Sequence, residues 1–257
     1  MSAGVGYEQR DETAYITFDR PAARNAMTWQ MYQALYDACE QIDADDSVRV
    51  AVLRGAGGKA FVAGTDIGQF RQFRTAEDGL RYERRISEVI DRLEAVTVPT
   101  VAVVEGYAAG GGLLLAAACD LRIATPDARF GLPIARTLGN CLSVSGCARL
   151  VALIGPARTL ELVYTAEFFD AELALGLGLA NEVVSRERLD ARVEELCQRL
   201  RSHAPRTMWA TKETIRRLRS HSLPDGDDIV AACYGSDDFH EGVAAFVDKR
   251  QPRWSGR

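Results

Sequence analysis

Histidine is scarce in this sequence, and its cysteines follow no metal-binding pattern. Three histidines occur in 257 residues, and all of them lie in polar segments towards the C-terminus, at His203, His221 and His240. The six cysteines show no CxxC spacing, and several stand in apolar, helix-like surroundings. Such cysteines are typically small buried hydrophobic residues in a reducing compartment. We therefore expect neither a metal site nor a disulfide framework.

Long apolar runs and an excess of positive charge are absent as well. No apolar run reaches the roughly 18 residues that a membrane-spanning helix needs. The N-terminus lacks the basic start and apolar core of a secretory signal. The net charge is −5, with arginine and lysine scattered along the chain, which argues against a nucleic-acid surface. The sequence thus predicts a globular cytoplasmic protein that has no membrane or nucleic-acid partner.

Strand-like and helix-like segments alternate over the first half of the chain. Alternating or continuous apolar patterns predict strands, and apolar residues at helical spacing predict helices. The expected strands are 13–18, 48–55, 100–106 and 120–125, and the expected helices are 27–42, 77–94 and the run after Gly112. This rate of alternation favours an α/β architecture with largely parallel strands, in which a strand–loop–helix unit recurs three times.

Helical patterns dominate after about residue 143. The sequence predicts one strand in this part, at 181–184, and helices at 145–154, 157–166, 170–175, 186–203, 205–220, 225–234 and 238–249. The last helix has an apolar side with Val243, Ala244 and Phe246. We expect such terminal helices to bury their apolar sides against the core or against another subunit.

Two loop-to-helix junctions carry candidate chemistry. Gly64 precedes Thr65 and Asp66, and three glycines, 110–112, precede Leu113. The first N–H groups of a helix have no intrahelical partner, and the helix dipole adds roughly half a positive charge there. If the two junctions met, two N–H groups would bind one oxygen and form an oxyanion hole. A glycine cluster alone is also typical of close packing between a helix and a strand.

Six stretches together resemble the enoyl-CoA hydratase/isomerase (crotonase) family. They are collinear, correctly spaced and cover nearly the whole chain: RPAARNAM (20–27), VAVLRGAGGKAFVAGTDI (50–67), VPTVAVVEGYAAGGGLLLAAACDLRIA (98–124), ARFGLP (128–133), GPARTLELVYTAEFFDAELALGLGLANEVV (155–184) and HEGVAAFVDKR (240–250). The resemblance implies a crotonase-like spiral of ββα units over residues 1–185, which holds an acyl-CoA site. It also implies a helical C-terminal part, residues 186–257, for oligomerisation and closure over coenzyme A. The expected assembly is a homotrimer or homohexamer.

The resemblance assigns roles to particular residues as well. The family's two oxyanion donors map onto the backbone N–H groups of Thr65 and Gly111. Coenzyme A is then part of the substrate, and no separate cofactor is expected. Asp66 is the natural cap of its helix, and without the resemblance Arg24 and Lys249 are ordinary surface charges. The family's coenzyme A segment maps onto Ala22–Asn25, where Arg24 is expected to meet a phosphate, with Ala63 beside the adenine and pantetheine path. Phe246 and Lys249 match the positions in the last helix that close over the nucleotide. The other expected substrate-binding residues are Asp66, Ile67, Gly110, Leu114, Pro133 and Ile134.

The acid–base residues of the family's hydratases are missing from this sequence. Those enzymes place one glutamate a turn into the helix after the glycines and a second one after the FGxP motif. Here the first position is Leu114, and the second is Ile134, or Ala135 if the one-residue length difference is placed earlier. Leu114 is three residues beyond Gly111, so it lies over the same helix face. General acid–base help contributes about 10²–10⁴-fold per group, so ordinary hydratase activity is doubtful.

The loop that follows offers substitutes, and three functions stay open. Arg136 is either a surface arginine or a partner for a substrate carboxylate. Cys141 is more typical of a quiet buried thiol than of a nucleophile. The first open function is a family enzyme with non-standard proton handling. The second is decarboxylation of a malonyl-type thioester, in which loss of CO₂ generates the enolate without a base. The third is a non-catalytic acyl-CoA-binding protein.

Overall fold

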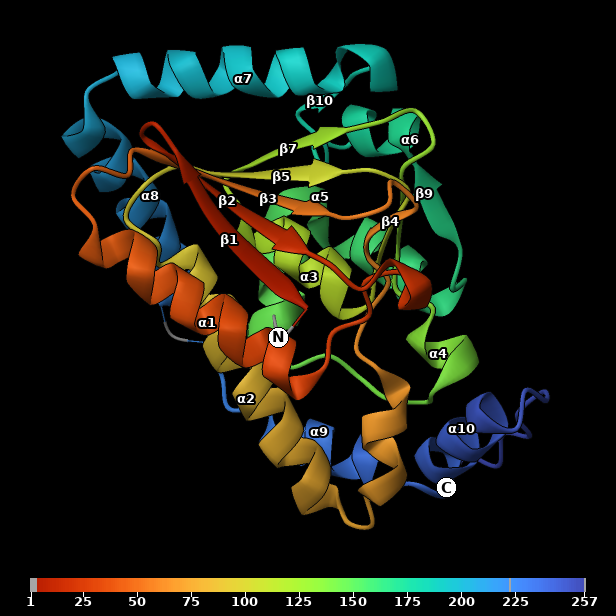
Figure 1. Cartoon of the computed structure of the whole chain (residues 1–257). Coiled ribbons are helices and arrows are strands. Elements are labelled where there is room, and N and C mark those ends of the chain that lie inside the picture. The colour runs from red at the N-terminus through yellow and green to blue at the C-terminus, as the bar shows by residue number, and fades with distance from the viewer. Residues whose placement is uncertain (1–3, 222, 257) are drawn as a thin grey trace.

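The computed structural model of the chain describes residues 4–221 and 223–256, which form two sheets surrounded by helices (Figure 1). The larger sheet has six strands, in the order β1 (Val5–Arg10), β2 (Thr13–Phe18), β3 (Val50–Gly55), β5 (Thr100–Val104), β7 (Leu121–Ala124) and β10 (Glu182–Val183). The smaller sheet has the order β4 (Ala60–Val62), β6 (Tyr107–Ala109), β8 (Arg129–Gly131) and β9 (Phe168–Asp170). In the described residues, no helix combines the length and apolarity needed to cross a membrane.

A strand–strand–helix unit repeats three times along the chain. The units are β3–β4–α2 (Ala76–Glu94), β5–β6–α3 (Gly111–Ala118) and β7–β8–α4 (Ile134–Thr137), and the 3-10 helix η2 (Ile67–Gln72) joins β4 to α2. Each unit gives its first strand to the larger sheet and its second strand to the smaller one. The strands β3, β5 and β7 are parallel to one another, as are β4, β6 and β8. This arrangement confirms the expected spiral of ββα units.

The larger sheet is buried on both faces, which explains the continuous apolar runs of its strands. In β3, Ala51 and Leu53 face one apolar cluster, whereas Val50 and Val52 face another. The first cluster is covered by α1 (Trp29–Ala44), α2 and α3, and the second by α7 (Arg186–Ser202). Figure 1 shows α7 lying across the outer side of this sheet. The expected boundary at residue 185 therefore falls just before a helix that covers the sheet itself.

The remaining helices complete the chain after α4. They are α5 (Val144–Tyr164), α6 (Ala171–Gly176), α8 (Pro205–Ser220), α9 (Asp227–Tyr234) and α10 (Asp237–Val247). The backbone of α5 is broken at Gly155, whose φ of 75° is not helical, so its two parts match the expected helices 145–154 and 157–166. Figure 1 places α9 beside α2, and α10 near α4. The last two helices thus return to the core of their own chain.

Several short elements escaped the sequence analysis. It missed β1, β4, β6, β8 and β9, of which the last four are three residues long. The expectation that 181–184 is the one strand after residue 143 is wrong, because Phe168–Asp170 pairs with β8 as an antiparallel strand. The last helix ends at Val247 rather than at residue 249. Three residues are too few to show the alternation that marks a strand.

Candidate active site

Three loops leave the smaller sheet on the same side, because β4, β6 and β8 are neighbouring parallel strands. The loop after β4 carries Thr65, the loop after β6 carries Gly111, and the loop after β8 leads to Ile134. Ligands of α/β proteins commonly bind beyond the carboxyl ends of parallel strands. The topology therefore gathers three of the expected site positions, although they are far apart in sequence.

The two glycine junctions are in close contact. A Cβ atom on Gly110 would lie 3.7 Å from the Cα of Gly64, and one on Gly111 would lie 3.4 Å from Oγ1 of Thr65. A Cβ on Gly112 would lie 1.9 Å from the carbonyl oxygen of Val62, at the end of β4. The glycines thus allow α3 to pack directly on β4, and the same packing brings the second junction against the first.

Backbone and hydroxyl hydrogen bonds fix Thr65 in this position. The N–H of Met27 donates to Gly64 O at 2.8 Å, and the N–H of Asp66 donates to Met27 O at 2.9 Å. In an extended backbone, successive N–H groups point to opposite sides, so the N–H of Thr65 points away from Met27. Oγ1 of Thr65 lies 2.8 Å from the hydroxyls of both Tyr32 and Tyr82. Within the described residues, neither the N–H of Thr65 nor that of Gly111 has a hydrogen-bond acceptor.

The two positions onto which the resemblance maps the hydratase glutamates are apolar and buried. Leu114 on α3 is 5% exposed, and Ile134 at the start of α4 is 7% exposed. Cδ1 of Leu114 lies 3.5 Å from where a Cβ on Gly146 would be, so Leu114 faces the first turn of α5. Ala135 is exposed.

The other two catalytic candidates, Arg136 and Cys141, are poorly placed for catalysis. Arg136 is exposed on α4, and residues two apart on a helix do not share a face, so it points away from the side of Ile134. Cys141 is half-buried beside Cys233, and the hydrogen bond between these thiols together with burial raises the pKa of Cys141. A thiol with a raised pKa is a poor nucleophile.

The expected coenzyme A segment is partly assembled. The N–H of Ala63 donates to Arg24 O at 3.1 Å, and the exposed Arg24 guanidinium lies 5.5 Å from the ring centre of Tyr107. Ala22 is exposed in the 3-10 helix η1 (Pro21–Ala23). Phe246, on α10, and Lys249, just after it, are exposed as well. In the described part of the chain, no hydrogen bond, ion pair or ring contact joins them to Arg24.

Asp66 and its neighbours shape the loop. The Asp66 carboxylate caps η2 by accepting a hydrogen bond from the Gly68 N–H at 3.0 Å, as expected from its place in the sequence. It also forms a 2.7 Å ion pair with Arg20. Ile67 and Pro133 are half-buried. These contacts hold the loop that presents Thr65.

Sequence reasoning missed a buried carboxyl group, Glu83 on α2. The hydroxyl of Tyr234 donates to Oε1 of Glu83 at 2.6 Å, and Nδ2 of Asn140 donates to that hydroxyl at 3.2 Å. Burial raises the pKa of Glu83 to about 7, although hydrogen bonds from Tyr234 and from the Ser143 N–H oppose the increase. The signal was present, because helical spacing places residue 83 on the apolar side of α2 with Ile86 and Ile90.

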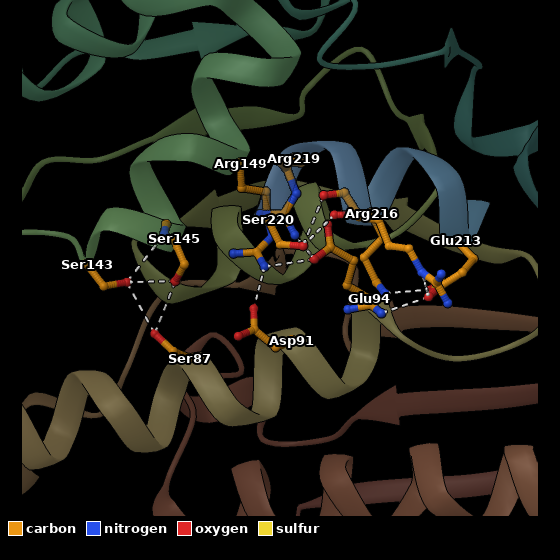
Figure 2. Close-up of polar contacts among 12 residues, drawn as sticks. Ser87, Asp91, Glu94, Ser143, Ser145, Arg149, Glu213, Arg216, Arg219 and Ser220 are labelled. Carbon is orange, nitrogen blue, oxygen red and sulfur yellow. Dashed lines mark hydrogen bonds and ion pairs between the residues drawn. The ribbon is translucent and has the colours of Figure 1, made fainter. Parts of the chain in front are cut away.

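Figure 2 shows what the same side of α2 meets along its length. Oγ of Ser87 lies 3.2 Å from Oγ of Ser143 and 3.4 Å from Oγ of Ser145. Towards the C-terminal end of α2, the buried Arg149 forms ion pairs with Asp91 at 2.8 Å and Glu94 at 3.0 Å. The helix α2 therefore lies against a group of hydroxyls one turn from Glu83 and against a buried ion-pair cluster at its C-terminal end.

In the residues that the structure describes, no group of three or more His, Cys, Asp or Glu side chains is placed to hold a metal ion.

Comparison with known proteins agrees with this architecture. The family model described as enoyl-CoA hydratase/isomerase matches residues 8–257. The fold and the loop geometry define a crotonase-type α/β protein, and the extent of this match identifies the family. The chain belongs to the enoyl-CoA hydratase/isomerase family, whose members are lyases and isomerases.

Individual relatives cover almost the whole chain. It is 32% identical to a short-chain-enoyl-CoA hydratase of Clostridium acetobutylicum over 248 residues, which are 95% of this chain and 94% of the relative. It is 36% identical over 251 residues to the mitochondrial enoyl-CoA hydratase domain-containing protein 2 of Bos taurus, covering 95% of this chain and 84% of the relative. Among solved structures, methylmalonyl-CoA decarboxylase complexed with 2S-carboxypropyl-CoA matches with a TM-score of 0.90 and 27% identity, covering 99% of this chain and 98% of that one.

Proposed function

We propose that this chain binds acyl-CoA thioesters and that the backbone N–H groups of Thr65 and Gly111 stabilise the enolate oxygen. The observation that carries the proposal is the contact between the two glycine junctions, at the ends of neighbouring strands. Neighbouring strands lie about 4.8 Å apart, so one oxygen can lie about 2.9 Å from both donors. Losing one such donor typically costs about 3–4 kcal/mol of transition-state stabilisation.

The contact between Arg24 and Ala63 supports the coenzyme A part of this proposal. The carbonyl of Arg24 binds the Ala63 N–H, one residue before Gly64, so the expected nucleotide segment adjoins the expected thioester site. The exposed Arg24 guanidinium is free to meet a phosphate. Phe246 and Lys249 stay predictions for closure over the nucleotide.

We further propose that the chain is a poor hydratase. Adding water to an enoyl thioester requires one group to activate water and one to protonate Cα. Leu114 and Ile134, at the positions of the two usual glutamates, carry no ionisable group. A relative named as a hydratase therefore does not define the reaction of this chain.

Decarboxylation of a malonyl-type acyl-CoA is the second candidate. The likeness to methylmalonyl-CoA decarboxylase over nearly the full length supports it. When the bond between Cα and the carboxylate breaks, CO₂ leaves. The electron pair of that bond stays with Cα and forms the enolate, so no base is needed. Arg136 stays the predicted carboxylate partner, although its exposed place on α4 does not by itself favour this role.

We propose a trimer or hexamer as the functional assembly. The helix α8 has no buried residue, and its exposed apolar side chains include Trp209, Ile215 and Leu218. An apolar pocket of about 510 Å³ lies beside it, lined in part by Leu153 and Met208. Exposed apolar surface of this kind is typical of a subunit interface.

Binding and turnover measured on the same preparation test the proposal. Calorimetry with acetyl-CoA and propionyl-CoA should give saturable binding. Crotonyl-CoA, a 3-enoyl-CoA and methylmalonyl-CoA should then be compared as substrates. The rate of crotonyl-CoA hydration should lie several orders of magnitude below that of a relative that carries both glutamates. The absence of binding heat up to millimolar concentration would refute the acyl-CoA site.

A further inference from the structure

Glu83 is a buried carboxyl group whose burial the fold alone does not explain. Glu83 is 8% exposed, and its carboxyl group accepts hydrogen bonds from the Tyr234 hydroxyl and the Ser143 N–H. No arginine or lysine in the described residues forms an ion pair with it. Burying an ionised carboxylate without a cation is costly. The presence of an acid at this buried position therefore indicates a role for its proton.

The position of Glu83 relative to the proposed donors suggests that role. Burial is the main cause that raises the pKa of Tyr32, and the charge of Glu83 adds to the increase. The Tyr32 hydroxyl lies 2.8 Å from Oγ1 of Thr65 and 2.7 Å from where a Cβ on Gly111 would be. Glu83 therefore lies within electrostatic range of the hydroxyl that contacts both glycine junctions.

The loop before α5 links Glu83 to the helix that follows the glycines. The N–H of Ser143 binds the Glu83 carboxyl group, and Oγ of Ser143 accepts a hydrogen bond from the Gly146 N–H at 3.3 Å. Gly146 in turn faces Cδ1 of Leu114. Glu83 and Leu114 thus approach the same short segment, residues 143–146, from different helices.

The carboxyl group also has polar surroundings that lead outwards. Glu83, Ser87, Ser143 and Ser145 line one pocket of about 230 Å³. Figure 2 shows the three hydroxyls within hydrogen-bonding distance of one another. Hydroxyl groups both donate and accept hydrogen bonds, so this cluster offers a path for a proton between Glu83 and solvent.

We propose that Glu83 is the group that exchanges a proton with Cα of the bound acyl-CoA, in place of the glutamates missing at Leu114 and Ile134. This inference rests on the proposed acyl-CoA function. In one direction the Cα–H bond breaks, its proton forms an O–H bond on the Glu83 carboxylate, and the electron pair becomes the enolate held by the Thr65 and Gly111 N–H groups. In the other direction the Glu83 acid protonates Cα, and its carboxylate is stabilised by the hydrogen bonds from Tyr234 and Ser143. The same second step would complete a decarboxylation.

The ionisation of Glu83 suits both directions. With a pKa of about 7, the group is present as acid and as base near neutral pH. Tyr234 and Tyr82 keep their protons throughout this range, because burial raises the pKa of both hydroxyls. The titratable groups whose pKa responds to Glu83 are Tyr32, Tyr82, Cys141, Cys147, Cys233 and Tyr234.

Deuterium exchange into propionyl-CoA tests the proposal. The whole protein is incubated with propionyl-CoA in D₂O, and mass spectrometry follows deuterium at Cα while calorimetry gives the affinity. We expect exchange that increases with pH to a plateau, with a midpoint near 7. Glu83→Gln should reduce exchange about 10²–10⁴-fold without changing the affinity. Glu88→Gln, an exposed glutamate on the same helix, is the matched control and should exchange normally.

A second variant separates proton transfer from a structural effect. Tyr234→Phe removes a hydrogen bond that favours the carboxylate, so the midpoint should move to higher pH while the plateau is largely kept. Glu83→Asp retains the acid and should restore part of the exchange, which keeps the test valid if Glu83→Gln does not fold. Normal exchange by Glu83→Gln, or binding by the wild type without any exchange, would overturn the role of Glu83. Failure of the wild type to bind would overturn the proposed function and this role with it.

Discussion

Tyr234 on α9 and Glu83 on α2 are joined by a 2.6 Å hydrogen bond although 151 residues separate them in sequence. Both side chains are buried, and Asn140 adds a hydrogen bond to the same hydroxyl from a third segment. Because this contact lies in a buried interior, the pKa of Glu83 depends on segments that only folding brings together. Ionisation of Glu83 is therefore coupled to the stability of the fold.

Replacing Glu83 should therefore change how stability depends on pH. The pKa of Glu83 is raised from 4.5 to about 7 in the folded chain, so the native state binds this proton more tightly than the unfolded state does. Ionisation of Glu83 then lowers the free energy of unfolding as pH rises from about 4.5 to 7, by up to about 3 kcal/mol. Glu83→Gln removes this loss, so the stability of the variant relative to wild type should increase over that interval. Urea unfolding at pH 5 and pH 8 measures the effect, and an unchanged difference between the two proteins would contradict it.

Installing the two missing carboxyl groups should raise crotonyl-CoA hydration. Leu114→Glu and Ile134→Glu together should increase the rate measurably, whereas either change alone should do little, because paired catalytic groups are not additive. Leu114 and Ile134 are buried, so desolvation would raise the pKa of the new glutamates and limit the gain. Leu114→Gln with Ile134→Gln is the matched control, because it has similar size and no acid. Equal rates for the two double variants would argue against the mapping of these positions.

A methyl group on Gly112 should disturb the contact between α3 and β4. The Cβ of Gly112→Ala would meet the carbonyl oxygen of Val62 at 1.9 Å, so the backbone must move. We expect the free energy of unfolding to fall by about 1–3 kcal/mol, and turnover to fall about 10²–10³-fold as the two donors separate. Gly176→Ala on α6 is the control, since nothing lies within 4 Å of its Cβ position. Chemical unfolding and the exchange assay report the two effects.

A charge on the exposed side of α8 should dissociate the assembly. Ile215 is 60% exposed and Leu218 is 74% exposed in the single chain. Ile215→Asp with Leu218→Asp would place two carboxylates in the proposed interface, where desolvation opposes them. Light scattering should change from a trimer or hexamer to the monomer mass of 28.1 kDa. Leu175→Asp, on an exposed leucine of α6, should leave the mass unchanged. A wild type that is already monomeric would refute this part of the proposal.

The long elements of this fold could be predicted from sequence, and the smaller sheet could not. The helix α2 has 19 residues with a clear apolar side, and β2 alternates over six residues, so local pattern was sufficient. In contrast, β4, β6 and β8 have three residues each and are defined by pairing between distant segments.

The candidate site divides in the same way. Glycines at the two junctions and the apolar Leu114 are visible in the sequence because they belong to contiguous motifs. Glu83 was not recognised, because its importance arises from Tyr234 and the 140–143 loop, which only folding brings to it. A carboxylate on the apolar side of a predicted helix was the one local sign.

The smaller sheet has a consequence for how this architecture acquires new reactions. Backbone hydrogen bonds between its parallel strands set the spacing of the Thr65 and Gly111 loops. Leu114, Ile134 and Glu83 belong to three separate helices. In the proposed site, a substitution at any one of them changes which atoms can transfer a proton, while the backbone donors for the thioester oxygen stay in place. If Glu83 has the proposed role, the acid–base group of this site has changed its helix while the backbone donors have kept their place.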